Sequence, residues 1–153
     1  MTNAIDNAIA RLQDIAAACT TVTFKSFPDY PVENVEPFPC SIAYVSGGAF
    51  VLTNKTVHHN FVVIALELHF PRVNLRQTYQ QINAIVLEFP KRLAGDPTLN
   101  NTIETIVAGA SNESPYECRP FQWSPAGVSP IIASQMLKFN ITVKTLQAPT
   151  VTA

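Results

Sequence analysis

The stretch that decides the fold is residues 56–93, which read TVHHNFVVIALELHFPRVNLRQTYQQINAIVLEFPKRL. Its first half is rich in β-branched and aromatic residues, and residues 61–66 are apolar at every position. A strand is apolar at both its odd-numbered and its even-numbered positions when both of its faces are covered. Residues 56–70 therefore predict a central strand. At roughly 3.3 Å per residue it would be about 50 Å long, so one end is expected to project as an arm.

The second half of this stretch predicts an amphipathic helix that begins after an Asn74 cap. Its apolar side chains recur at steps of three and four residues: Leu75, Tyr79, Ile82, Val86, Phe89 and Leu93. Pro90 is expected to end or kink this helix, because proline removes a hydrogen bond and clashes one turn back. The Gly-Asp-Pro sequence at residues 95–97 then predicts a stop and a turn.

Upstream, a first amphipathic helix is predicted after Asn3, which is a plausible N-cap. Its apolar stripe consists of Ile5, Ile9, Leu12, Ile15 and Cys19. Residues 40–45 predict a strand that Gly47 and Gly48 break or turn. Residues 50–52 and 56–70 are then expected to form the two arms of a hairpin.

Downstream, residues 102–108 predict another strand, and the chain from Ile131 to Lys144 contains a final one. In this last strand the core side is predicted to alternate with a solvent side that carries Lys138, Asn140, Thr142 and Lys144. Two proline-rich stretches, residues 27–39 and 111–130, are predicted to be loops. The longer loop is expected to be functional, because unstructured loops of this length are uncommon in compact domains.

This order of helix, strands, helix and strands predicts an α+β fold. A mostly antiparallel sheet is expected to pack against two main helices in a single domain spanning residues 1–147. Residues 148–153 are expected to form a flexible C-terminal tail. The chain has 153 residues, which is enough for one domain and its core.

The composition favours a subunit of an assembly. Charged residues make up only 14% of the chain and nearly cancel, with a formal net charge of −1, whereas about 25% is typical of soluble domains. A near-zero net charge favours association. The lack of a basic excess argues against tight nucleic-acid binding. No membrane-spanning run and no signal peptide are expected. Three widely spaced cysteines fit a reducing compartment.

The residues that could take part in catalysis or metal binding form no recognisable active site. Glu67 and His69 are two residues apart on a predicted strand, so both would reach one ion, but no third ligand is near in sequence. His58 and His59 are adjacent and would point to opposite faces. No nucleophile elbow or phosphate-binding loop is present. We therefore expect a protein that is not an enzyme and that has no cofactor and no metal.

Three groups of residues are instead candidates for contacts with partners. The first loop carries acidic side chains with no base between Lys25 and Lys55, and it would suit a rim that faces a partner or lines a pore for DNA. Aromatic and arginine side chains of the second loop suit a subunit contact. Two arginines near the second helix would pair with a neighbour's acidic loop. The candidate residues are Asp29, Glu33 and Glu36, then Tyr116, Arg119, Phe121 and Trp123, and then Arg72 and Arg76.

The chain resembles the tail terminator, or tail-completion, proteins of long-tailed bacteriophages. The resemblance is carried by the opening helix, the long hairpin that ends at residues 66–68, the helix from Leu75 and the final strand. Its most specific part is the segment from Phe89 to Leu99, in which a helix ends and an Asp-Pro-Thr-Leu turn leads towards a strand. In the family this turn often continues through glycines, whereas here Asn100, Asn101 and Thr102 follow it.

The resemblance implies a ring subunit, in most cases of a hexamer, at the head-proximal end of the tail tube. Such a ring ends tube growth and presents a surface for joining the head through the neck. The implied partners are other copies of the chain, the tail tube protein and a neck or head-completion protein, with DNA passing only through the lumen. The implied location is the virion tail and neck, and the host cytoplasm during assembly. No catalytic residue carries over.

Three alternatives remain open from the sequence. A head-closure or adaptor protein of the neck would share the ring but dock on the portal side. A tail-tube subunit would polymerise beyond a ring. A small-molecule enzyme or binding domain would be a monomer or dimer with a pocket near Tyr44, Tyr79 or Trp123.

Overall fold

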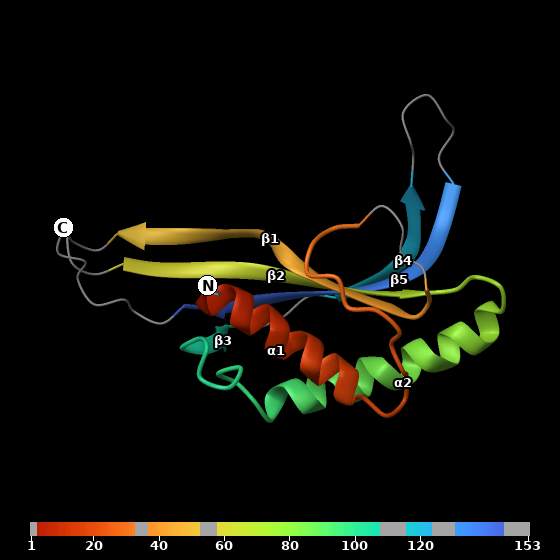
Figure 1. The fold of residues 1–153 in the computed structure, drawn as a ribbon, viewed down its shortest axis with the longest axis horizontal. Coiled ribbons are helices and arrows are strands. Elements are labelled where there is room, and N and C mark those ends of the chain that lie inside the picture. Colours follow the sequence, from red (N-terminus) through yellow and green to blue (C-terminus); the bar gives the residue numbers. More distant parts are fainter. Residues whose placement is uncertain (1–2, 33–36, 53–57, 108–115, 124–130, 146–153) are drawn as a thin grey trace.

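The computed structural model describes residues 3–32, 37–52, 58–107, 116–123 and 131–145, with only the backbone described at 58–59, 122–123 and 131–133. Two helices, α1 (Ala4–Ala18) and α2 (Leu75–Ala94), lie beneath a five-stranded sheet (Figure 1). The strands are β1 (Cys40–Leu52), β2 (His58–Phe70), β3 (Thr105–Val107), β4 (Tyr116–Trp123) and β5 (Ile131–Lys144). The predicted α+β fold is therefore confirmed.

All strand pairs are antiparallel, and the order β1-β2-β5-β3 places β2 and β5 in the centre. β3 and β4 pair with the same edge of β5. β3 lies beside residues 142–144, and β4 lies beside residues 131–139. Between Ile64 and Phe70, β2 is buried on both faces, as its continuous apolar run predicted. The sheet thus has a helix-covered face and a second face that is covered in part by the segment containing Val32 and Phe38.

The main core lies between the helices and the sheet. Helix α1 begins with a capping box in which Asn3 and Asp6 exchange hydrogen bonds, and its predicted stripe is buried except for the half-buried Ile5. The stripe predicted for α2 is wrong in its first turns, because Leu75 and Tyr79 are exposed. The buried face of α2 consists instead of Thr78, Ile82, Ile85 and Phe89. Thr78 is accommodated there because its hydroxyl donates to the carbonyl of Pro71 at 2.8 Å.

Helix α2 does not end at Pro90, but continues to Ala94 with Gly95 as its C-cap. The last turn is held by tertiary and side-chain contacts that offset the lost hydrogen bond. Leu93 packs against the main core, and Arg92 pairs with Glu88 one turn earlier at 3.0 Å.

The loop predicted over residues 111–130 is wrong in its central part, where residues 116–123 form strand β4. Pro120 is compatible with a strand here, because β4 is an edge strand of the described sheet and its only described partner is β5. The strand predicted over residues 102–108 is reduced to the three residues of β3. A turn with positive φ at Leu99, Asn100 and Asn101 precedes it.

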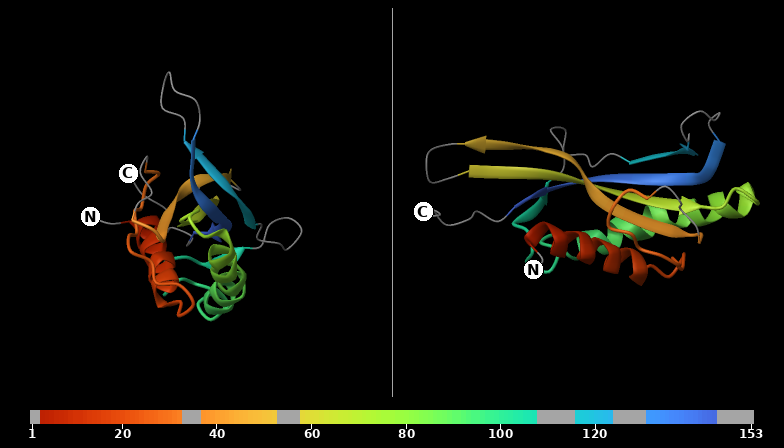
Figure 2. Two further views of the ribbon diagram at one scale, coloured as in Figure 1. Left: turned by 90° about the vertical axis from the view of Figure 1, so that its right-hand side faces the viewer. Right: turned by 45° about the horizontal axis from the view of Figure 1, so that its top comes forward.

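Two ribbons extend beyond the helical layer. We call the outer parts of β1 and β2, residues 45–52 and 58–63, the long ribbon, which continues past both helices as the sequence predicted (Figure 1). We call residues 119–123 and 131–135 of β4 and β5 the short ribbon, which turns away from the plane of the sheet (Figures 1 and 2). In the long ribbon every residue of β1 from Val45 to Leu52 is exposed, so this strand offers a surface that the core does not use.

The prediction that Gly47 and Gly48 break the strand is wrong, because β1 runs through both of them. The pairing register between β1 and β2 shifts between Val45 and Gly47, which marks a β-bulge. A Cβ atom at Gly48 would lie 2.3 Å from the carbonyl oxygen of Phe61, whereas one at Gly47 would meet nothing within 4 Å. Glycine at position 48 thus allows the close approach of two backbones at the base of the long ribbon.

We expect Gly48→Ala to lower the free energy of unfolding by about 1–3 kcal/mol, because the backbone must shift to accept the methyl group. Gly47→Ala is the matched control, since the same methyl group enters open space there. Urea denaturation of both variants measures the difference. Equal stability of the two variants would contradict the close approach at Gly48.

Candidate subunit interface

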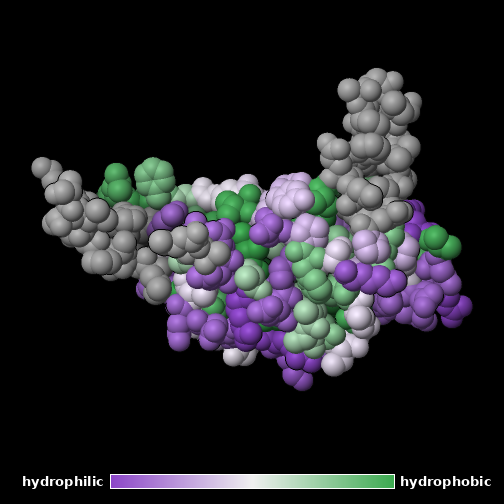
Figure 3. Space-filling model, in the orientation of Figure 1, coloured by the Kyte–Doolittle hydropathy of each residue, from purple (hydrophilic) through white to green (hydrophobic). Residues whose placement is uncertain are grey.

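The long ribbon exposes apolar side chains that the fold leaves uncovered. In β1 the residues from Cys40 to Ala43 are buried, whereas every residue from Val45 to Leu52 is exposed. Phe50 and Leu52 are 69% and 70% exposed. Figure 3 shows hydrophobic surface over this end of the molecule. Apolar clusters of this kind mark interaction sites. The sequence indicated the projecting arm but not which of its side chains are exposed.

The outer edge of β1 is also open for part of its length. Near the core it is covered by the segment after α1, where Ser41 and Ala43 donate backbone hydrogen bonds to Ser26 and Pro28 at 3.0 and 3.1 Å. Beyond Ala43, no described residue pairs with this edge. An open edge presents backbone N–H and C=O groups that can pair with another chain. The long ribbon thus combines apolar side chains with an edge available for strand addition.

The four candidates of the second predicted loop all lie on β4, but they do not form one patch. Tyr116 is exposed and contacts Phe139, with a distance of 5.6 Å between ring centroids. Phe121 is half-buried on the other face of the sheet and meets the ring of His69 edge-on at 4.9 Å. Arg119 is exposed and pairs with Glu117 at 3.3 Å. Trp123 belongs to β4 by its backbone, but its side chain lies outside the described residues.

The charged candidates lie in three different settings. Arg72 precedes α2 and donates to the Oε1 atom of Gln135 at 2.5 Å, so it braces the end of β2 against β5. Arg76 is exposed on the first turn of α2. Asp29 is exposed and lines a hollow against α1. Glu33 and Glu36 lie outside the described residues.

A polar network that the sequence did not predict lies buried on the second face of the sheet. The hydroxyl of Tyr44 donates to Glu67, whose other carboxylate oxygen lies 3.0 Å from Nε2 of His69. The Nδ1 atom of His69 lies 2.6 Å from the hydroxyl of Ser134. Burial alone would raise the pKa of Glu67, but the hydrogen bonds from His69 and Tyr44 outweigh it and lower the pKa below its ordinary value.

The burial of this network and the bonds within it indicate that it stabilises the sheet. It contains serine, histidine and carboxylate in the order of a hydrolase triad, but Ser134 and His69 are both 0% exposed. Glu67 and His69, considered as ligands of one ion, bond to each other instead. Within the described residues, no group of three or more His, Cys, Asp or Glu side chains is placed to hold a metal ion.

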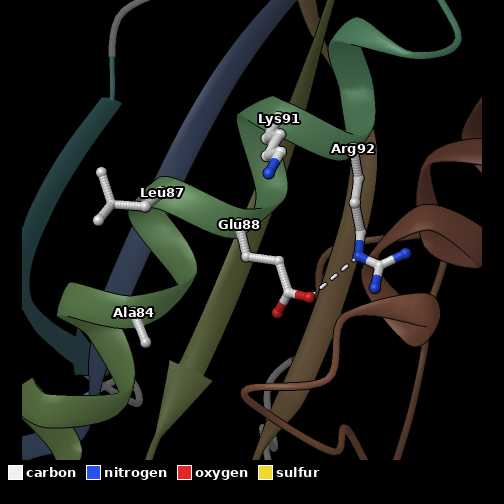
Figure 4. Close-up of a pocket in the computed structure, with 5 residues that line it drawn as sticks. All are labelled: Ala84, Leu87, Glu88, Lys91 and Arg92. Carbon is white, nitrogen blue, oxygen red and sulfur yellow. Dashed lines mark hydrogen bonds and ion pairs between the residues drawn. The ribbon is translucent and has the colours of Figure 1, made fainter.

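Glu88 ties the end of α1 to α2. Its carboxylate accepts a hydrogen bond from Nε of Arg92 at 3.0 Å (Figure 4). It also accepts hydrogen bonds from the backbone N–H groups of Thr20 and Thr21 at 3.0 Å and from both threonine hydroxyls. The backbone hydrogen bond from Thr20, with the other donors, holds the pKa of Glu88 well below its ordinary value. The side chain is 16% exposed.

We expect Glu88→Gln to lower the free energy of unfolding at pH 7 by about 1–2 kcal/mol, because hydrogen bonds to a charged acceptor are replaced by neutral ones. A carboxyl whose pKa is lower in the folded than in the unfolded protein stabilises the fold above the unfolded pKa, about 4.3. The difference from the unmodified protein should therefore persist at pH 5–8 and shrink as the pH falls below 4. Glu104→Gln, at a carboxylate that is 45% exposed, should change stability little at any pH.

Comparisons with known proteins do not assign a function to this geometry. Neither the models of known protein families nor the curated proteins include a match to the chain. Neither α1 nor α2, the helices of the described residues, is long and apolar enough to span a lipid bilayer. The long ribbon, with its open edge and apolar side chains, is therefore the feature from which a function is inferred.

Proposed function

We propose that this protein is a structural subunit that assembles with copies of itself into a closed ring. The observation that carries the proposal is the long ribbon, which exposes Phe50 and Leu52 and leaves the edge of β1 open. Both features become buried if a neighbouring copy receives the ribbon. A contact between two different surfaces repeats from copy to copy, and it forms a ring when the rotation closes.

The resemblance of the sequence to tail terminators suggests the position of the proposed ring in the virion. Tail terminators of long-tailed bacteriophages, which the sequence resembles, are small α+β proteins, and this chain has an α+β fold. In this role the ring lies at the head-proximal end of the tail tube, ends tube growth and joins the tail to the neck. DNA passes through its lumen, for which acidic side chains are suited because they repel phosphate.

The composition supports assembly over catalysis. Only 14% of the residues are charged, which fits a surface that is largely covered by neighbours. The buried network around His69 offers no accessible nucleophile, since Ser134 is 0% exposed. A neck adaptor and a tail-tube subunit remain the alternatives within the same structural class.

Negative-stain images of the purified protein at high concentration, with its mass from light scattering, test the proposal. We expect rings of one size with a central hole wide enough for duplex DNA. Long tubes would instead indicate a tail-tube subunit. A stable dimer without a hole would contradict the ring, and a chain that stays monomeric even when tail tube protein is added would contradict the terminator role.

A further inference from the structure

The outer flanks of the two helices carry opposite charges. The helices lie side by side beneath the sheet, so that α1 faces outwards on one side and α2 on the other (Figure 2). The outer stripe of α1 follows steps of four, four and three residues and consists of Asp6, Ala10, Asp14 and Ala17. The outer stripe of α2 follows steps of four, four, three and four and consists of Arg76, Gln80, Ala84, Leu87 and Lys91. Its last residue, Lys91, also lines a hollow between the helices together with Asp14 of α1.

The α1 flank forms an acidic groove. A hollow of about 440 Å³ lies between α1 and the segment that follows it, and Phe27 and Asp29 line its far wall. Its other lining residues include Asp6 and Asp14, and no basic side chain of the described residues lines it. The exposed alanine side chains of the α1 stripe leave room for a side chain of another molecule. The groove therefore suits an apolar group that is accompanied by positive charge.

The α2 flank has the complementary properties. Leu87 is 75% exposed and lies beside a hollow of about 510 Å³ (Figure 4). Arg76 and Lys91 are exposed at the two ends of the stripe, and neither forms an ion pair with any described residue. Glu88, the acidic side chain at this hollow, is bonded to Thr20, Thr21 and Arg92.

We propose that the α2 flank of one copy docks into the α1 groove of the next copy. Leu87 of one copy enters the hollow along α1 of the next copy, and Arg76 faces the acidic side chains there, which include Asp29. This inference rests on the proposed ring and adds a second contact to the one made by the long ribbon. The partner is a second copy because one chain carries both complementary surfaces on different helices, and a head-to-tail contact joins two different surfaces of the same chain.

The test combines three variants. Leu87→Asp should weaken ring assembly about a hundredfold, because it removes the apolar group and places a negative charge against the acidic groove. Asp29→Lys and Arg76→Glu should each weaken assembly about tenfold at low salt, and less at high salt. An equimolar mixture of these two reversed variants should regain assembly, because copies that alternate around an even-numbered ring restore attraction at every contact.

The controls are the unmodified protein and a charge reversal outside both surfaces, Glu104→Lys, and circular dichroism establishes that each variant is folded. Assembly is followed by sedimentation velocity as a function of concentration. If the three variants assemble as well as the controls, or if mixing restores nothing, the helical contact is wrong, although the ring itself would stand. If the unmodified protein forms no ring, the proposed function and this contact fail together.

Discussion

Replacing Phe50 and Leu52 by lysine should convert the assembled protein into a folded monomer. Both side chains point to the same face of the long ribbon, since they are two residues apart on β1. They are 69% and 70% exposed in the single chain, so the substitutions remove nothing from its core. Buried aromatic and aliphatic anchors of an interface contribute about 2 kcal/mol or more each. Loss of both should weaken each contact by at least about 100-fold.

Light scattering and urea denaturation together measure this effect. The first should report the mass of a monomer at concentrations where the unmodified protein forms rings, and the second should report an unchanged free energy of unfolding. Val73→Lys is the matched control, because Val73 is 96% exposed but lies beside α2 and not on the ribbon. Rings that survive the double substitution would show that the long ribbon is not the subunit contact.

Much of the fold follows from local patterns in the sequence. The alternation in β5 placed Leu137, Phe139, Ile141 and Val143 in the core, and all four are buried. The capping residues Asn3 and Asn74 begin the two helices as predicted. These features were predictable because each depends on residues within a turn or two of one another, where periodicity and capping dominate.

The errors arose where distant residues decide the outcome. Two consecutive glycines, Gly47 and Gly48, are typical of a strand break, but pairing with the β2 backbone makes them part of a β-bulge. Pro120 argued for a loop, whereas pairing with β5 makes that segment an edge strand. In α2 the buried face passes through Thr78 and not Tyr79, because contact with the sheet selects the face. Pattern alone contains none of these tertiary contacts.

The candidate interface was predictable only in outline. The length of the strand predicted over residues 56–70 implied a projecting arm, and the low charge implied a covered surface. Which apolar side chains remain exposed depends on where the helical layer ends, which no local pattern records. Leu87 illustrates this: it lies within an apolar run of α2, yet it is 75% exposed. The polar network of Tyr44, Glu67, His69 and Ser134 draws on three strands, so its assembly depends on the register of the sheet.

The largest effect on stability is expected at His69. His69→Leu should lower the free energy of unfolding at pH 7 by about 3–5 kcal/mol, because it leaves the buried carboxylate of Glu67 without its main partner. This is a large share of the 5–15 kcal/mol typical of a domain. Ser134→Ala is the milder comparison, since it removes one neutral hydrogen bond and should cost about 1–3 kcal/mol. Urea denaturation measures both.

The double variant Glu67→Leu with His69→Leu separates a lost interaction from a buried unpaired charge. If the cost comes from the orphaned carboxylate, the double variant should be more stable than His69→Leu alone, because it buries no charge.

The pH dependence of stability should agree with this result. In the unmodified protein the pKa of Glu67 is lowered, so its contribution to stability is present above about pH 4.3 and is lost as the pH falls. In His69→Leu, burial is opposed only by the hydrogen bond from Tyr44 and the charge of Lys138, so the pKa of Glu67 should be higher than in the unmodified protein and its stabilising contribution smaller. The cost of His69→Leu should therefore grow from pH 3 to pH 7. A cost that is independent of pH would mean that packing, and not charge, holds this part of the sheet together.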